Sequence, residues 1–97
     1  MIRLNKGTIE YLYVDVTDKM GSLTDLDAYT ISWVTYPSSD DETPIEQGSA
    51  TNQGMVVTAG PIDTSGTKYD EAEYVLYITL TLAPQAIKLG PYTFAVG

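Results

Sequence analysis

The chain has 97 residues, enough for one small domain and too few for two. It contains neither cysteine nor histidine, which excludes disulfides, thiolate metal sites, thiol nucleophiles and the imidazole that most often acts as a general base. The formal net charge of -8, from 13 acidic and 5 basic residues, disfavours binding to nucleic-acid phosphates.

The first half of the chain alternates apolar and polar residues between turn signals. Residues 2–4 form a short start before the turn signal at residues 5–7. Residues 8–16, TIEYLYVDV, alternate with a period of two, which is typical of a half-buried strand. We expect Leu12, Val14 and Val16 to face the core, and Ile9, Tyr11 and Tyr13 to lie on the partly exposed face.

The middle of the chain is less regular. Residues 17–22 predict a turn, and residues 23–28 fit either a short helical turn or a loop. Residues 29–36, YTISWVTY, predict a strand with Ile31 and Trp33 on one face, ended by Pro37. Residues 37–44 predict an exposed loop, and the weak pattern of residues 45–53 allows a short edge strand.

The last part predicts three further strands. Residues 55–59, MVVTA, form a short one, followed by a loop at 61–68 and an acidic corner at 70–73. Residues 74–82 alternate with Tyr74, Leu76, Ile78, Leu80 and Leu82 on one face. A break at 83–85 precedes a final strand at 89–96 with Tyr92, Phe94 and Val96 on one face. Without any helical period over ten residues, the chain predicts an all-β antiparallel sandwich of about seven strands in one domain, 1–97.

The acidic corner carries a short motif. Asp70, Ala72 and Tyr74 stand in the order D-x-A-x-Y, which resembles the E–F corner of immunoglobulin-like domains. In that family the tyrosine hydroxyl bonds back to the backbone upstream, and strand C carries a buried tryptophan, as Trp33 would here. Leu76 stands where antibody domains have a cysteine, so aliphatic packing would replace their disulfide. The resemblance implies that Asp70, Tyr74, Trp33 and Leu76 hold the corner and core without binding a ligand.

Short motifs of another kind are spread over nearly the whole chain. They include Lys6-Gly7-Thr8, Val16-Thr17-Asp18, Asp25-Leu26 and Tyr74, within the segments KGTIEYLYVDVTD, SLTDLDAYTISWVTYP and EAEYVLYITLTLAPQAIKLGPYTFAV. In these motifs the chain resembles small actinobacteriophage virion proteins, and its plan is similar to the N-terminal domain of phage baseplate upper proteins. Glu73 departs from the glycine usual before the tyrosine, and residues 38–52 match nothing in that pattern.

The resemblance implies a non-enzymatic virion structural protein, made in the host cytoplasm without a signal peptide. The leading expectation is a small capsid accessory or decoration protein on the phage head, with the major capsid protein or other virion proteins as partners. A homo-oligomer is left open, and no membrane partner is expected because no stretch reaches the length of a membrane span. A tail or baseplate component and a carbohydrate-binding, adhesin-like module are the alternatives.

The eight tyrosines suggest where a partner binds, because tyrosine is enriched at protein interfaces. Ile9, Tyr11 and Tyr13 could form a docking patch, joined by Tyr77 if its strand is adjacent. The alternative is cross-strand aromatic packing on a solvated sheet, which stabilises the fold instead. Residues 1–6 could act as an N-terminal arm that adds a strand to a partner sheet.

No catalytic arrangement or cofactor site is expected. The serines lack a histidine to activate them, and no phosphate-binding glycine loop is present. Calcium is the one metal considered, through oxygen ligands, although no group has the spacing of a defined calcium loop. The candidate groups are Asp40, Asp41 and Glu42 in the loop 38–52; Asp15 and Asp18 beside Asp70 and Glu71; and Asp25 with Asp27.

Overall fold

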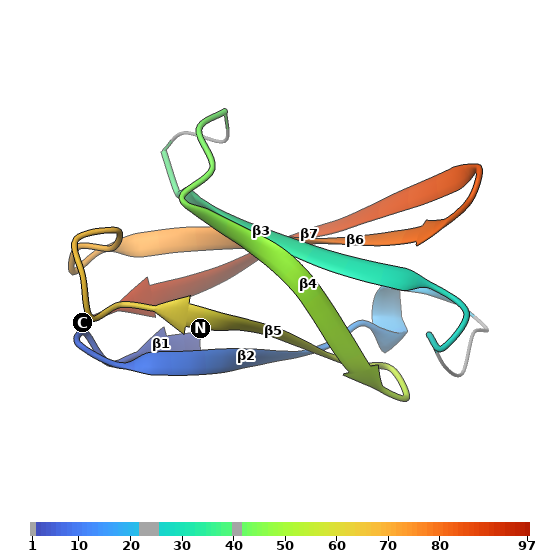
Figure 1. The fold of residues 1–97 in the computed structure, drawn as a ribbon, viewed down its shortest axis with the longest axis horizontal. Coiled ribbons are helices and arrows are strands. Elements are labelled where there is room, and N and C mark those ends of the chain that lie inside the picture. The colour runs from blue at the N-terminus through green and yellow to red at the C-terminus, as the bar shows by residue number, and fades with distance from the viewer. Residues whose placement is uncertain (1, 22–25, 40–41) are drawn as a thin grey trace.

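The computed structural model describes residues 2–21, 26–39 and 42–97, and nearly all the regular secondary structure of these residues is β-strand (Figure 1). A 3-10 helix, Thr17–Lys19, is a single short turn after the second strand. The strands within the described residues are β1 (Ile2–Leu4), β2 (Ile9–Asp15), β3 (Thr30–Pro37), β4 (Glu46–Gln53), β5 (Val56–Asp63), β6 (Glu73–Leu82) and β7 (Gln85–Val96).

The strands form two layers joined through β4. The hydrogen-bonded order is β1-β7-β6-β3-β4-β5-β2, and every pair is antiparallel except β1 with β7. Residues 46–50 of β4 pair with β3, whereas residues 51–53 pair with β5. We call β1, β7, β6, β3 and residues 46–50 sheet A, and residues 51–53, β5 and β2 sheet B. The predicted all-β sandwich is confirmed.

The strand pairing follows the immunoglobulin-like plan. β2 pairs with β5 in one layer, while β3 lies between β4 and β6 in the other, with β7 next to β6. These are the positions of strands B and E, and of C, F and G, in that architecture. Trp33 is therefore on the strand equivalent to C, and Tyr74 begins the strand equivalent to F.

The core lies between the two sheets and is built by the period-two faces. Burial of each large aliphatic side chain contributes about 1.5–3 kcal/mol to folding, so these residues are the main source of stability. Leu82, predicted on the same face as Leu80, is instead 49% exposed because it lies at the tip of the β6–β7 hairpin. The buried strand residues include Leu12, Val14, Ile31, Trp33, Val57, Ile62, Leu76, Ile78, Leu80 and Phe94.

Three strand boundaries differ from the predicted ones. β4 has eight residues and contacts both sheets, although its sequence is almost entirely polar. β5 continues through Gly60-Pro61 to Asp63, and β7 begins at Gln85 and continues through Gly90-Pro91. Each Gly-Pro pair opposes one residue on the neighbouring strand, which is a β-bulge, so a proline can lie within the strand without a missing ladder bond.

A tyrosine covers each of these bulges. Gly60 has φ of 141°, and a Cβ there would lie 2.9 Å from Cδ1 of Tyr11. Gly90 has φ of 125°, and a Cβ there would lie 3.1 Å from Cδ1 of Tyr77. Both positions therefore require glycine, for backbone conformation and for space. Tyr11 in sheet B and Tyr77 in sheet A thus have equivalent structural roles.

Residues 2–6 are not a free arm, which corrects the expectation of an N-terminal arm at 1–6 for the described part of that segment. Residues 2–4 pair in parallel with residues 94–96 of β7, and the amide of Gly97 donates to the carbonyl of Leu4 over 3.0 Å. Leu4 is buried at 3% exposure, and Lys6 donates to the carbonyls of Thr64 and Gly66. The physical reason is that Leu4 joins the core, which fixes the segment to its own sheet.

We expect the substitution Leu4→Ala to lower the free energy of unfolding by about 2–3 kcal/mol, because it leaves a cavity where β1 closes the core. Ile2→Ala is the matched control, since Ile2 is 38% exposed on the same strand and its loss should cost well under half as much. Urea denaturation of both variants measures the difference. Equal, small effects would show that β1 does not contribute to the core in solution.

Candidate partner-binding surface

Three exposed apolar side chains project from β2 on the outer face of sheet B. Ile9, Tyr11 and Tyr13 are 61%, 48% and 66% exposed, and we call them the tyrosine face. They are exposed because the intervening positions Leu12 and Val14 point into the core, so strand alternation directs the odd-numbered residues outward. The structure thus places these three predicted residues together at the surface.

The β5 residues opposite the outward-facing residues of β2 are one apolar and two polar side chains. On β5, Thr58 lies opposite Tyr13, Val56 opposite Asp15, and Asp63 opposite Ile9. Neither β2, β4 nor β5 contains a lysine or arginine. The hydroxyl and then the amide of Thr17 hold the pKa of Asp15 below its usual value. The pKa of Asp63 is lowered in the same way by the hydroxyl and then the amide of Ser65, so both carboxylates are ionised at neutral pH.

Tyr77 does not belong to this surface. β6 pairs with β3 and β7 in sheet A, whereas β2 pairs with β5 in sheet B, so the strands are not adjacent. The Tyr77 ring lies edge-on to Tyr36 at a centroid distance of 5.8 Å, and Lys88 Nζ lies 4.2 Å from its centroid. The predicted four-residue patch is therefore wrong in this member, and Tyr77 packs within sheet A.

Tyr74 forms the corner that the D-x-A-x-Y order indicates. Its hydroxyl accepts a hydrogen bond from the amide of Asp70 over 2.7 Å and donates to the carbonyl of the same residue over 3.1 Å. The ring packs against Tyr69 and Phe94 in an aromatic cluster, and Leu76 is fully buried beside it. These contacts connect the corner to the core, a structural role.

A second buried tyrosine, Tyr69, lacked any sequence signal. It lies between the predicted loop at 61–68 and the corner at 70–73, and it is fully buried. Its hydroxyl lies 2.6 Å from Oγ1 of Thr35 and donates to Oε1 of Glu46 over 2.9 Å. Burial raises the pKa of Tyr69 far above its usual value, so the hydroxyl stays protonated. Lys68 pairs with the same carboxylate at 3.4 Å, and the group holds the loop against β3 and β4.

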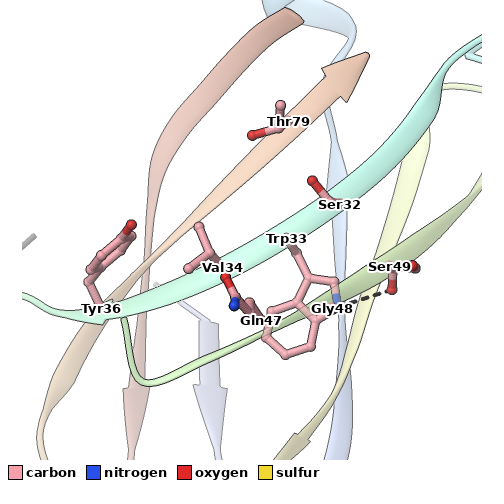
Figure 2. A pocket seen from close by; sticks show the side chains of 8 residues that line it. All are labelled: Ser32, Trp33, Val34, Tyr36, Gln47, Gly48, Ser49 and Thr79. Carbon is pink, nitrogen blue, oxygen red and sulfur yellow. Dashed lines mark hydrogen bonds between the residues drawn. The ribbon is translucent and has the colours of Figure 1, made fainter. Parts of the chain in front are cut away.

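A shallow depression of about 410 Å³ lies over β3, β4 and β6 on sheet A (Figure 2). None of its lining side chains carries a carboxylate or an ammonium group, so the depression offers hydrogen-bonding groups and no strong acid or base. The residues around it are Ser32, Trp33, Val34, Tyr36, Gln47, Gly48, Ser49 and Thr79.

Trp33 is a core residue, even though it borders this depression. It is only 3% exposed, and its indole Nε1 donates to the carbonyl of Ser49 over 3.1 Å (Figure 2). The ring packs onto Gly48 of β4, where an added Cβ would lie 3.1 Å from Nε1. The indole therefore has no free face on which a sugar ring could stack.

The calcium candidates are not assembled by the part of the chain that the structure describes. Asp25, Asp40 and Asp41 lie outside the described residues. Asp15 lies opposite Val56, at the start of β5, whereas the loop that carries Asp70 follows Asp63, at the end of β5. Asp15 and Asp70 therefore lie toward opposite ends of sheet B. Over residues 2–21, 26–39 and 42–97, no three acidic side chains are placed to hold a metal ion. No helix in the same residues is long and apolar enough to cross a membrane.

We expect Tyr74→Phe to lower the free energy of unfolding by about 1–2 kcal/mol, since it removes both corner hydrogen bonds and leaves the Asp70 amide without its partner. Tyr13→Phe, the same change at a side chain 66% exposed, should be nearly neutral. Chemical denaturation of both variants tests this. A neutral Tyr74→Phe would show that the corner contributes nothing to stability.

We also expect Gly48→Ala to destabilise the fold by about 1 kcal/mol and to shift the fluorescence of Trp33, because the indole must move away from the new methyl group. Gly66→Ala is the control, as a Cβ there meets nothing within 4 Å. Trp33 is the single tryptophan, so its emission reports the movement directly. Unchanged emission in Gly48→Ala would contradict the close packing.

Comparison with protein-family models, with curated proteins and with solved structures gave no significant match. A role for this chain has to be argued from its residues and its surfaces.

Proposed function

We propose that this chain is a non-enzymatic bacteriophage virion structural protein, bound as a small accessory protein to the head lattice. The tyrosine face is the observation that carries a binding role: three large apolar side chains stand exposed side by side on one rigid strand. Contiguous exposed apolar surface marks interaction sites, and tyrosine suits a surface that is wet until a partner covers it. The motif resemblance supplies the phage assignment.

A capsid lattice would use such a surface efficiently. Each copy offers only a small apolar area, so one contact alone would be weak. A shell presents the same site many times, and a protein that bridges neighbouring subunits gains affinity from two contacts made together. Because the tyrosine face lies on a sheet that is already folded, binding would need little ordering of the chain.

A tail or baseplate component is the nearest alternative. The resemblance to the N-terminal domain of baseplate upper proteins favours it, and the same surface would serve there. The head and tail proposals therefore differ only in where the protein binds on the particle.

A carbohydrate-binding module is a second candidate from a different class. Tyr11 and Tyr13, both exposed on one strand face, favour it because sugar rings stack on exposed aromatic rings. The burial of Trp33 weighs against it, and so does the position of the Tyr11 ring against Gly60, which leaves Tyr13 as the freer of the two rings.

The test is co-sedimentation of the purified chain with phage heads and, separately, with tails, both stripped of their native copy. We expect saturable binding to heads at many copies. Tyr13→Ser should weaken it about tenfold, the effect of losing one well-packed aromatic contact. Leu82→Ser is the matched control, since Leu82 is 49% exposed on a strand of the other sheet.

Three results would contradict this proposal. Binding to tails alone would move the protein to the tail or baseplate. Binding to neither particle, with retention on an insoluble polysaccharide that Tyr13→Ser abolishes, would favour the carbohydrate-binding candidate. Equal losses from Tyr13→Ser and Leu82→Ser would remove the tyrosine face as the docking surface.

A further inference from the structure

One side of β2 is an open sheet edge. Among the described strands, β2 pairs with β5 alone, and it lies along the lower left margin of the fold in Figure 1. The amide of Val16 donates to Met55, and the carbonyl of Thr8 accepts from Thr64, so even-numbered residues direct their backbone groups toward β5. In an antiparallel ladder the alternate residues point the other way. The backbone N–H and C=O of Tyr13 and Asp15 therefore face the open side.

Over residues 11–14 this edge lacks several of the devices that usually protect an exposed strand. Such edges are typically short, or carry lysine or proline, or are covered by another element. β2 is seven residues long, IEYLYVD, and contains neither lysine nor proline. Its residue types, dominated by isoleucine, tyrosine, leucine and valine, favour extended pairing.

The other described edges are protected. β1 has three residues, one of them Arg3. The part of β7 that precedes its pairing with β1 carries Lys88 and Pro91. β4 is polar, and the carbonyl of Ser49 already accepts a hydrogen bond from the indole N–H of Trp33. β5 pairs with β4 only at residues 56–58, and Pro61 lies in the rest of that edge. The comparison singles out β2 as the described edge left open for pairing.

The charge around β2 indicates the kind of strand that would pair with it. β2, β4 and β5 contain no basic residue, while Glu10 and Asp15 lie on β2 and Asp63 on β5. Lys6 and Lys68 act on Asp63 at one end of the strand, whereas the pKa of Asp15 at the other end is lowered by Thr17 and by no basic side chain. A second copy would bring another net charge of -8 to the same edge, which opposes self-pairing.

We propose that the open edge of β2 accepts an extended segment of a basic protein partner, which adds a strand to sheet B. Main-chain hydrogen bonds to Tyr13 and Asp15 would hold the segment, as in other cases of strand addition. Its side chains on the outer face would lie beside the tyrosine face and Asp15, where a basic side chain would pair with the Asp15 carboxylate. This inference rests on the protein-binding role proposed above and names the chemistry of the partner.

The test uses two synthetic peptides, KVTVKVTVK and its acidic counterpart EVTVEVTVE, added to the 15N-labelled chain at low salt. We expect the amide signals of Tyr13 and Asp15 to shift saturably with the basic peptide, and their hydrogen exchange to slow about tenfold or more. The acidic peptide should leave both unchanged, and added salt should weaken the effect.

Matched variants show whether the edge itself is responsible. Tyr13→Lys places a like charge where the peptide would bind, and should weaken binding at least about tenfold. Leu82→Lys makes the same change in net charge at an exposed residue of sheet A, and should leave binding intact. Equal losses in the two variants would mean general charge attraction and would overturn the proposal.

Two other results would overturn it. One is protection of the same amides in the chain alone, rising with its concentration, since the occupant would then be a second copy. The other is no shift, or shifts spread over both sheets. The peptide assay needs no phage particle, so its failure is separable from that of the virion role. Peptide binding without binding to heads or tails would refute only the virion role, and the reverse would refute only the edge.

Discussion

The sandwich depends on β4, because this one strand hydrogen-bonds to both layers. Trp33 packs on Gly48 shortly before β4 changes sheet, and only a glycine lets the indole lie that close. At the start of the same strand, Glu46 accepts a hydrogen bond from the hydroxyl of the buried Tyr69. This bond fixes the loop before the corner to β4. At β4 itself, the crossing from one sheet to the other thus relies on polar contacts and a missing side chain, while aliphatic burial holds the two sheets together elsewhere.

That dependence explains which parts of the fold could be predicted. The period-two pattern identified β2, β3 and β6, because each has one face in the core and one outside, and the tyrosine of the D-x-A-x-Y order does bond to Asp70. β4 has no such pattern, since its residues are almost all polar and bury few apolar groups. Tyr69 was missed because its burial depends on ring contacts with Tyr74 and Phe94 and on hydrogen bonds from its hydroxyl to distant residues, which leave no periodic pattern in the sequence.

The candidate surface shows a different limit. Tyr11, Tyr13 and Tyr77 look alike in an alternating sequence, but two of them cover glycine bulges and one does not. Which sheet each strand joins is decided by pairing between distant segments, and alternation alone does not specify it. Ile9, Tyr11 and Tyr13 could be grouped from sequence because they share a strand, whereas adding Tyr77 required a strand neighbour that the fold does not provide.

The same acidic charge serves two purposes at β2. An open edge rich in tyrosine and aliphatic residues would tend to pair with further copies of itself, and negative charge on every copy opposes this. A basic segment meets no such repulsion, so the charge that limits self-association also selects the partner. β1 pairs with β7 of its own chain, so it is not free to add to a partner's sheet. In strand addition, the added strand would therefore come from the partner. The preformed edge and the adjoining tyrosine face then act as one binding site, with the backbone supplying affinity and the charge supplying specificity.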